Sequence, residues 1–462
     1  MARQAERNFT IEGRHIGSKT NLEIVCLSSL LFGIVASFLV GDLLGEDSTG
    51  WACFDFYKYH WPLIELFSAT PWGKAVADYG GIPGVNPLLY MSASLMPLHG
   101  DQKTYHVITF VVALLTWPLL SWAYYRRYSS HGIGWLWALF GAGAILLSPT
   151  FRSSAFWGTT DWFPFVFCAG TSLLLSRFQD YPATDKAPAI DPFTLAVLTT
   201  VSASAFYSRQ FYAFVPVMAA WVVLTRTKTS PVLVLSFFGL AMLPEMFLFY
   251  LWKGLSAPAH RAEQAAHLPT SLVVNLWMVG TMIGLFSLPV IVGCIRRSLS
   301  DVLPEWWGSR STVIAVVGLL VFVMALRATE WPGEGGGIIV KTGLTMGALG
   351  TPFILIASYF GLVTAILFSV GSATDALLAG TFLAPFFILP LFMGPPTAQR
   401  YLEPSLAVAL FLFSDTETSR RIFNKRVLMY NFAFSTLILA IGIGYYHNFS
   451  VEVCSSVARI SG

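Results

Sequence analysis

Long apolar runs recur along almost the whole chain and constrain its fold more than any other feature of the sequence. Only helices and closed barrels satisfy their backbone groups inside a bilayer, and apolar runs near membrane-spanning length indicate helices. We therefore expect an all-α, polytopic membrane protein that forms a single domain over residues 1–462, with further helices in its external loops. About 13 transmembrane helices are predicted, centred near residues 32, 115, 140, 169, 200, 218, 241, 283, 319, 361, 385, 408 and 436.

Composition supports this fold class and excludes several functions. Charged residues make up 11% of the chain, whereas soluble domains carry about 25%. The net charge of +3 is divided among short separate loops, so we expect no nucleic-acid partner. The five cysteines lack metal-ligand spacing, so neither a zinc site nor a disulfide framework is indicated, and no metal or cofactor is expected. Cys53 and Cys454 are either a pair or two free thiols.

Basic residues predict the orientation in the membrane. The polar segment of residues 1–20 precedes a run of spanning length, and we expect no cleaved signal peptide there. If this end is cytoplasmic, 17 of the 28 Lys and Arg residues face the cytoplasm, as the positive-inside tendency requires. The long segments then lie outside. They are a large external loop over residues 45–104, a second loop over residues 252–271, and a third over residues 327–350.

Four apolar runs are too short to cross the membrane upright, namely residues 162–175, 195–207, 211–224 and 401–413. At 1.5 Å per residue they cover only about 20 Å of a hydrocarbon core near 30 Å. Their outer ends must be recessed, and they carry polar residues that would cost about 2 to 4 kcal/mol without a partner or a wet cavity. These residues predict an outward-open polar site: Asp161, Arg209, Gln210, Arg400 and Glu403.

Each recessed residue also has a plainer interpretation. Arg209 could snorkel to the lipid headgroups. Asp161 could cap the helix that begins at Trp162, and Arg400 with Glu403 could form a structural ion pair. The functional hypothesis rests on several such residues falling on one side of the membrane.

Two external loops add candidate residues. Asp55 lies among aromatic residues in the first loop, where a carboxylate shielded from bulk water can act as a general base. The alternative is an exposed Asp in an ordinary interfacial loop. Lys253, His260 and His267 supply hydrogen-bond donors that could bind an anionic headgroup. Their alternative is a solvated loop that meets anionic lipids.

These motifs, taken in order, resemble the GT-C glycosyltransferases, most nearly the α-1,2-glucosyltransferases that use dolichyl-phosphate glucose in N-glycan precursor assembly. The similar pieces are Asp55 with His60 and Pro62, Pro83 to Tyr90, Thr159-Thr160-Asp161, Ser208-Arg209-Gln210, His267-Leu268-Pro269, and Arg400-Tyr401 with Pro404. The spacing from Asp55 to His60 is one residue longer than in that family. An Asp also stands at position 161, where the family has Glu.

The resemblance implies a GT-C fold and an inverting transfer of a hexose, glucose by analogy, from a polyprenyl-phosphate donor to a lipid-linked or other external glycan acceptor. It implies Asp55 as the base, with Asp161 as the second candidate. Arg209, Arg400, Lys253, His260 and His267 would bind the donor phosphate, and His60, Gln210, Tyr401 and Glu403 would bind substrate. The site would face the periplasm of a bacterial inner membrane or the lumen of the endoplasmic reticulum.

Two other functions compete with this one. A transporter or flippase for a lipid-linked or anionic sugar would line its pathway with the same recessed charges. Its ionisable residues should then also occur at mid-membrane or on both faces. A structural subunit without chemistry would tolerate Asp55→Asn and Arg209→Ala.

Overall fold

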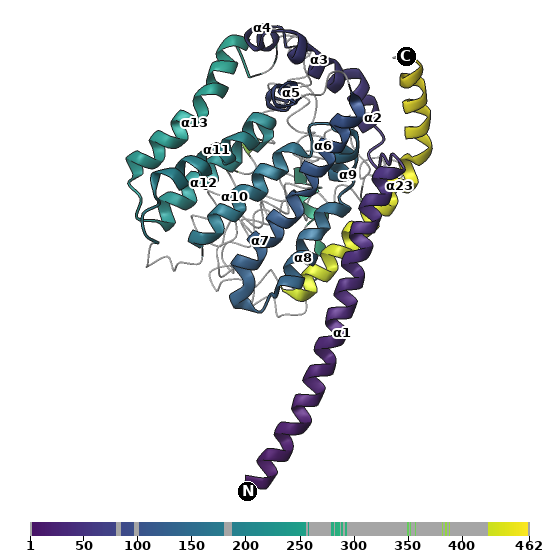
Figure 1. The fold of residues 1–462 in the computed structure, drawn as a ribbon, viewed down its shortest axis with the longest axis vertical. Coiled ribbons are helices and arrows are strands. Elements are labelled where there is room, and N and C mark those ends of the chain that lie inside the picture. The colour runs from purple at the N-terminus through teal and green to yellow at the C-terminus, as the bar shows by residue number, and fades with distance from the viewer. Residues whose placement is uncertain are drawn as a thin grey trace.

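The computed structural model describes residues 2–79, 85–96, 101–179, 187–255, 257 and 424–460, with scattered positions between 279 and 388. Within these ranges the side chains of residues 2–20, 131, 179, 445 and 447–460 are not described. This part of the chain is helical and contains no strand, only two isolated bridges, Val85 with Arg209 and Ala187 with Thr227. Figure 1 shows the helices as a bundle from which the first half of α1 projects.

Four helical segments among the described residues are long and apolar enough to cross a membrane, which supports an all-helical membrane protein. The count of 13 spans is not confirmed. Seven of the expected centres fall within helices and the centre near 115 falls at the turn between α6 and α7, whereas the centres near 283, 319, 361, 385 and 408 fall among residues that are mostly or wholly undescribed. The four long segments are Asn21–Leu43 in α1 (Ala2–Leu43), Gln102–Tyr128 in α6 (Gln102–Leu114) and α7 (Thr116–Tyr128), α13 (Pro231–Trp252), and Lys425–Gly444 in α23 (Lys425–Ile460).

The short apolar helices lie where short runs were expected. With 13 residues, α12 covers about 20 Å, and with 17 residues α10 and α11 cover about 26 Å each. The expected run over residues 401–413 lies outside the described residues. The shorter elements are α8 (Trp135–Gly143), η3 (Ala144–Leu147), α9 (Pro149–Trp157), α10 (Phe163–Gln179), α11 (Pro192–Ser208), η4 (Gln210–Ala213) and α12 (Phe214–Arg226).

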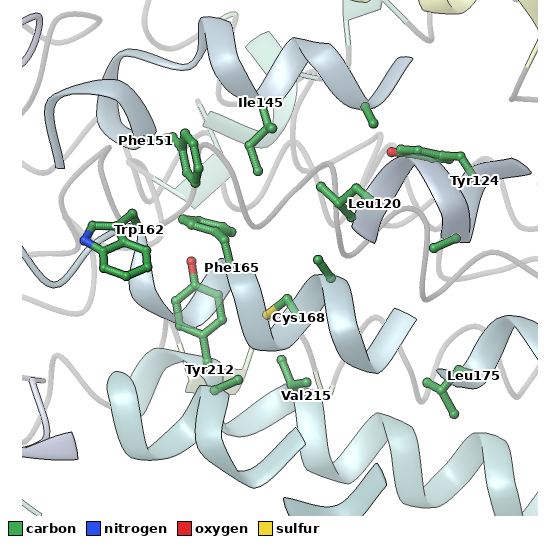
Figure 2. Close-up of a cluster of buried hydrophobic side chains, with 14 of the residues drawn as sticks. Leu120, Tyr124, Ile145, Phe151, Trp162, Phe165, Cys168, Leu175, Tyr212 and Val215 are labelled. Carbon is green, nitrogen blue, oxygen red and sulfur yellow. The ribbon is translucent and has the colours of Figure 1, made fainter. Parts of the chain in front are cut away.

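The core of the bundle is built around α10, which contacts α7, α11 and α12. Figure 2 shows Phe165 of α10 between Phe151 and Tyr212, with ring centroids 6.0 and 5.6 Å away. Cys168, one turn further along α10, is fully buried and is a free thiol. These aromatic contacts join α9, α10 and η4, and so fix the helix ends that carry the polar residues discussed below.

One end of the bundle carries the segment that we expect to be the first external loop, and this segment is itself helical. We call this end the loop end, and its described residues are 44–79, 85–96, 101, 158–162, 209–213, 252–255 and 257. Cys53 of α2 forms a disulfide bond, and the side chain of Cys454 lies outside the described residues. The loop contains α2 (Ala52–Asp55), the π-helix η1 (Phe56–His60), α3 (Trp61–Ala69), α4 (Trp72–Ala77) and α5 (Leu88–Ser94).

The opposite end, where α7, α10 and α12 finish and α8, α11, α13 and α23 begin, is called the basic end (Figure 1). Arg126 and Arg127 lie in the last turn of α7, and Arg226 lies in that of α12. Lys425 starts α23 and forms an ion pair of 2.5 Å with Glu23. Basic residues at helix ends on one face of a bundle are the pattern that the positive-inside tendency predicts.

A buried arginine fastens the loop end to the bundle. Arg152 of α9 is fully buried and binds both carboxylate oxygens of Glu46, at 2.8 Å through Nε and 2.5 Å through Nη2. It also donates to the backbone oxygens of Ser37 and Leu146, at 2.9 and 3.1 Å. The planar guanidinium therefore joins the end of α1, the η3 turn and the start of the loop.

Arg152→Ala should destabilise the protein by about 3 to 5 kcal/mol, because it leaves the largely buried Glu46 carboxylate without its cation. Thermal unfolding in detergent micelles measures the loss. Lys74→Ala, which removes an exposed cation from α4, should change stability by less than about 0.5 kcal/mol. Equal shifts for the two variants would contradict an anchoring role for Arg152.

Candidate functional site

Six of the eleven predicted site residues are described, and all six lie at the loop end. They are Asp55, His60, Asp161, Arg209, Gln210 and Lys253. The other five, which are His260, His267, Arg400, Tyr401 and Glu403, lie outside the described residues.

The turn after α9 positions Asp161. Gly158 ends α9 in the left-handed region, with φ 64°, and its carbonyl accepts a hydrogen bond of 2.8 Å from the Tyr105 hydroxyl. A Cβ at this position would lie 2.5 Å from the Tyr105 ring, so glycine is required for two reasons. Ser154 Oγ then accepts the amide hydrogen of Trp162 at 2.9 Å. The carboxylate between these two anchors faces Arg209 and forms an ion pair with it.

Arg209 occupies the tip between α11 and η4. Its backbone is extended, with φ −150° and ψ 131°, and pairs with Val85 of the first loop in an antiparallel bridge. The side chain is 3% exposed, so it does not snorkel to the headgroups. Besides Asp161, which is 8% exposed, it contacts the Thr160 hydroxyl at 3.2 Å through Nη2. The tips of two short helices thus meet through opposite charges.

Three further polar residues form a hydrogen-bonded chain beside the ion pair. Asn86 donates through Nδ2 to Glu245 Oε1 at 2.7 Å and to the Phe206 carbonyl at 2.9 Å. Gln210 donates through Nε2 to Asn86 Oδ1 at 3.2 Å and to the Leu255 carbonyl at 2.7 Å. Asn86, Gln210 and Glu245 are each at most 2% exposed. With Asp161 and Arg209 they make what we call the polar cluster.

Two tyrosines and a histidine bond within the first loop, and the tyrosine hydroxyls feel the charge of Arg209 in the polar cluster. His60 Nδ1 lies 2.7 Å from the Tyr90 hydroxyl, and the Tyr79 hydroxyl donates to the Val85 carbonyl at 3.0 Å. Burial raises the pKa of the Tyr79 and Tyr90 hydroxyls well above their usual range, and the nearby positive charge of Arg209 opposes part of the rise. Both hydroxyls are therefore neutral and keep their protons as donors.

Asp55 is the last residue of α2, and η1 follows it without a break. The carboxylate is half-buried, unlike those of the polar cluster. Phe56 is fully buried against the rings of Tyr105 and His106, with centroids 6.0 and 4.5 Å away. A π-helical turn holds more residues than an α-helical one, and such turns are frequent at functional sites.

Lys253 ends α13 in the left-handed region, with φ 50°, and its side chain is exposed. The preceding Trp252 is buried, stacks on Tyr79 with centroids 5.5 Å apart, and donates to the Val76 carbonyl at 3.1 Å. The end of α13 is thereby held against α4. Lys253 consequently lies at the surface of the loop end, two residues from the carbonyl that binds Gln210.

Comparison with protein-family models, with curated proteins and with solved structures found no match to this chain. What the site can do therefore follows from its own chemistry. It holds a buried guanidinium able to bind an anion, two buried carboxylates, and a more accessible carboxylate at Asp55. Among the described residues, no group of three His, Cys, Asp or Glu side chains is placed to hold a metal ion.

Sequence reasoning missed several members of this site. Glu245 carried a usable signal, because an acidic residue inside an apolar run of spanning length is a default pointer to function. Asn86 and Tyr90 lay inside a motif that was recognised, but nothing in the sequence assigned them a role. Thr160 and Tyr79 carried no signal of their own, since neutral polar residues are common in loops.

Asp161→Asn should destabilise the protein by about 3 to 5 kcal/mol, because Arg209 would remain charged, buried and without its carboxylate. Adding Arg209→Gln to that variant should recover most of the loss, since the remaining charge is then removed. Thermal unfolding in detergent measures both. Asp191→Asn is the matched control, because Asp191 is an exposed helix cap at the basic end and Asn caps equally well. If the double variant lost as much stability as the sum of the losses from the two single substitutions, Asp161 and Arg209 would not be coupled.

Proposed function

We propose that this chain is an inverting glycosyltransferase of the GT-C type, which takes a sugar from a polyprenyl-phosphate donor and works at the loop end. The proposal combines the ordered motif resemblance with the chemistry of the polar cluster. Its donor would be a hexose, glucose by analogy, and its acceptor a lipid-linked or other external glycan. Membrane lipids would surround the apolar helices, and the donor tail would enter between them.

The observation that carries the proposal is the buried ion pair between Arg209 and Asp161. Transfer from a polyprenyl phosphate releases a phosphate that gains negative charge in the transition state. A guanidinium held in an environment of low dielectric stabilises such charge far more than one in water. Asp161 keeps Arg209 in place before the donor binds. The donor phosphate would then share or replace that carboxylate as the partner of the guanidinium.

The reaction balances with one base and one leaving group. A hydroxyl oxygen of the acceptor attacks the anomeric carbon, the bond from that carbon to the phosphate oxygen breaks, and its electron pair leaves on the polyprenyl phosphate. The hydroxyl proton passes to Asp55, which is half-buried at the loop end. The remaining predicted phosphate ligands are Arg400, Lys253, His260 and His267, and the remaining substrate ligands are His60, Gln210, Tyr401 and Glu403.

Two observations support an external location for the loop end. Cys53 is disulfide-bonded, and disulfides persist in oxidising compartments such as the periplasm or the lumen of the endoplasmic reticulum. Basic residues collect at the opposite end of the bundle, which is the expected cytoplasmic side. The site would then face the periplasm in a bacterium or the lumen in a eukaryote.

Glu245 favours the transporter alternative, because it is a buried carboxylate inside a spanning helix. However, its hydrogen-bond partner is Asn86 of the external loop. It also lies only 7 residues before the end of α13 at Trp252, about 10 Å along the axis. We therefore assign it to the loop-end site. Movement of a lipid-linked sugar across proteoliposomes without any sugar transfer would support the transporter instead.

Asp55→Asn should abolish sugar transfer while leaving donor binding within about 3-fold of the wild type, because it removes the base but no phosphate ligand. The assay is transfer of radiolabelled sugar from a panel of polyprenyl-phosphate donors into membrane lipids, with donor affinity measured in parallel. Asp78→Asn, an exposed acid at the same end, should leave both values unchanged. Equal loss of transfer and binding in Asp55→Asn would indicate a structural role for α2, and full transfer activity would show that Asp55 is not the base.

Arg400→Ala should weaken donor binding by about 10-fold or more, because a charge-assisted hydrogen bond to phosphate contributes about 1.5 to 3 kcal/mol. Binding of polyprenyl phosphate without its sugar isolates this contact. Arg426→Ala, at the exposed start of α23, is the control and should bind normally. An unchanged affinity in Arg400→Ala would remove that residue from the proposed site.

A further inference from the structure

The orientations of two buried amides in the polar cluster are fixed by backbone carbonyls. A carbonyl only accepts hydrogen bonds, so the atom of Asn86 that faces the Phe206 carbonyl at 2.9 Å must be the donor Nδ2. The atom of Gln210 that faces the Leu255 carbonyl at 2.7 Å must likewise be Nε2. Neither amide can be turned over without placing two acceptors against each other. The direction of the hydrogen-bonded chain is therefore defined.

With the amides in these orientations, one of their acceptor atoms has no hydrogen bond among the described residues. Gln210 Nε2 uses its two hydrogens on Leu255 and Asn86. Gln210 Oε1 is buried and has no hydrogen-bond partner among the described residues, in a residue that is 1% exposed. Buried polar atoms in folded proteins are nearly always paired, and an unpaired one calls for a specific explanation. A donor from outside this part of the chain is the simplest one.

The charges around Gln210 restrict what that donor can be. Gln210 directly follows Arg209 in the chain and is linked to the Glu245 carboxylate through Asn86. In a cluster that holds charges of both signs a neutral donor matches best, and a neutral hydroxyl supplies the hydrogen that Oε1 lacks. Arg209 and Gln210 would then bind two parts of the same donor molecule. The guanidinium would bind its phosphate, and the amide would bind its sugar.

We propose that Gln210 Oε1 is the acceptor of a subsite that binds one hydroxyl of the donor sugar, and that Glu245 is the positioning residue of that subsite. The inference rests on the glycosyltransferase function proposed above and names the group of the substrate that this subsite binds. Glu245 acts through Asn86. Its carboxylate accepts the second hydrogen of Asn86 Nδ2 and so holds the amide together with the Phe206 carbonyl. The amide then presents Oδ1 to Gln210 Nε2, which leaves Oε1 for the ligand.

The first experiment uses the wild-type full-length protein in detergent. Dissociation constants are measured for polyprenyl-phosphate glucose and for its 2-, 3-, 4- and 6-deoxy analogues. One of the four deoxy donors should bind about 5- to 30-fold more weakly than the glucose donor, because it lacks the hydroxyl that pairs with Oε1 and so leaves this atom unpaired. If every deoxy donor binds as tightly as the glucose donor, a water molecule satisfies Oε1 and the subsite does not exist. This result is independent of any variant.

The second experiment assigns the lost contact to Gln210. Gln210→Met should weaken binding of the glucose donor by the same factor, and it should show no further loss with the deoxy donor that the wild type discriminates. Met246→Ala, on the lipid-exposed side of α13, is the control and should discriminate like the wild type. Discrimination that persists unchanged in Gln210→Met would place the hydroxyl contact elsewhere and overturn the proposal.

The third experiment separates a positioning role of Glu245 from a general structural one. Glu245→Leu should reduce the preference for the glucose donor over the deoxy donor, whereas Glu245→Gln should restore it, because a Gln side chain can still accept from Asn86 Nδ2. Loss of stability without a change in that preference would overturn the role of Glu245. Absence of binding or transfer with every donor of the panel would instead refute the glycosyltransferase function, and the subsite with it.

Discussion

The ion pair between Arg209 and Asp161 joins two helix tips at the loop end, where water can barely reach either residue. A guanidinium in so buried a residue needs a carboxylate partner, because an unpaired charge at such depth would cost more than the packing around it contributes. The partner has to come from another helix tip, and this requirement explains the local geometry. The left-handed Gly158 turns the chain so that Asp161 faces inward, and the extended backbone of Arg209 directs its side chain across the gap. Two helices too short to span the bilayer are thereby joined below the expected level of the headgroups.

The polar cluster also joins parts of the chain that are far apart in sequence. Val85 and Asn86 bring the first loop to the tip between α11 and η4, and Glu245 connects both to the interior of α13. The aromatic residues of the loop pack around this junction, with Tyr79 stacked on Trp252. Apolar packing places these helices approximately, whereas hydrogen bonds define which atoms face one another. Chemistry that depends on orientation requires the second kind of contact.

The sequence predicted much of this arrangement and left specific parts open. Run length alone indicated that the helices after Asp161 and around Arg209 are too short to span, and the four long helical segments coincide with predicted spans. The pairing of Asp161 with Arg209 could not be predicted, because run lengths do not tell which helix tips meet. The π-helical turn at residues 56–60 depends on the contacts of Phe56 with α6, which are distant in sequence. Glu245 was predictable in principle, whereas Asn86 acquires its role only through partners that lie more than 100 residues away.

The separation of these partners along the chain has a consequence for biogenesis. Asn86 bonds to Phe206 and Glu245, which follow it by 120 and 159 residues. At roughly 5 to 20 residues per second, synthesis delivers those partners about 6 to 30 s after the loop itself. During this interval the amide of Asn86 and the aromatic residues around it are exposed on the nascent chain. The loop end is therefore the last part of this region to mature, and its assembly depends on α13 having been inserted into the membrane.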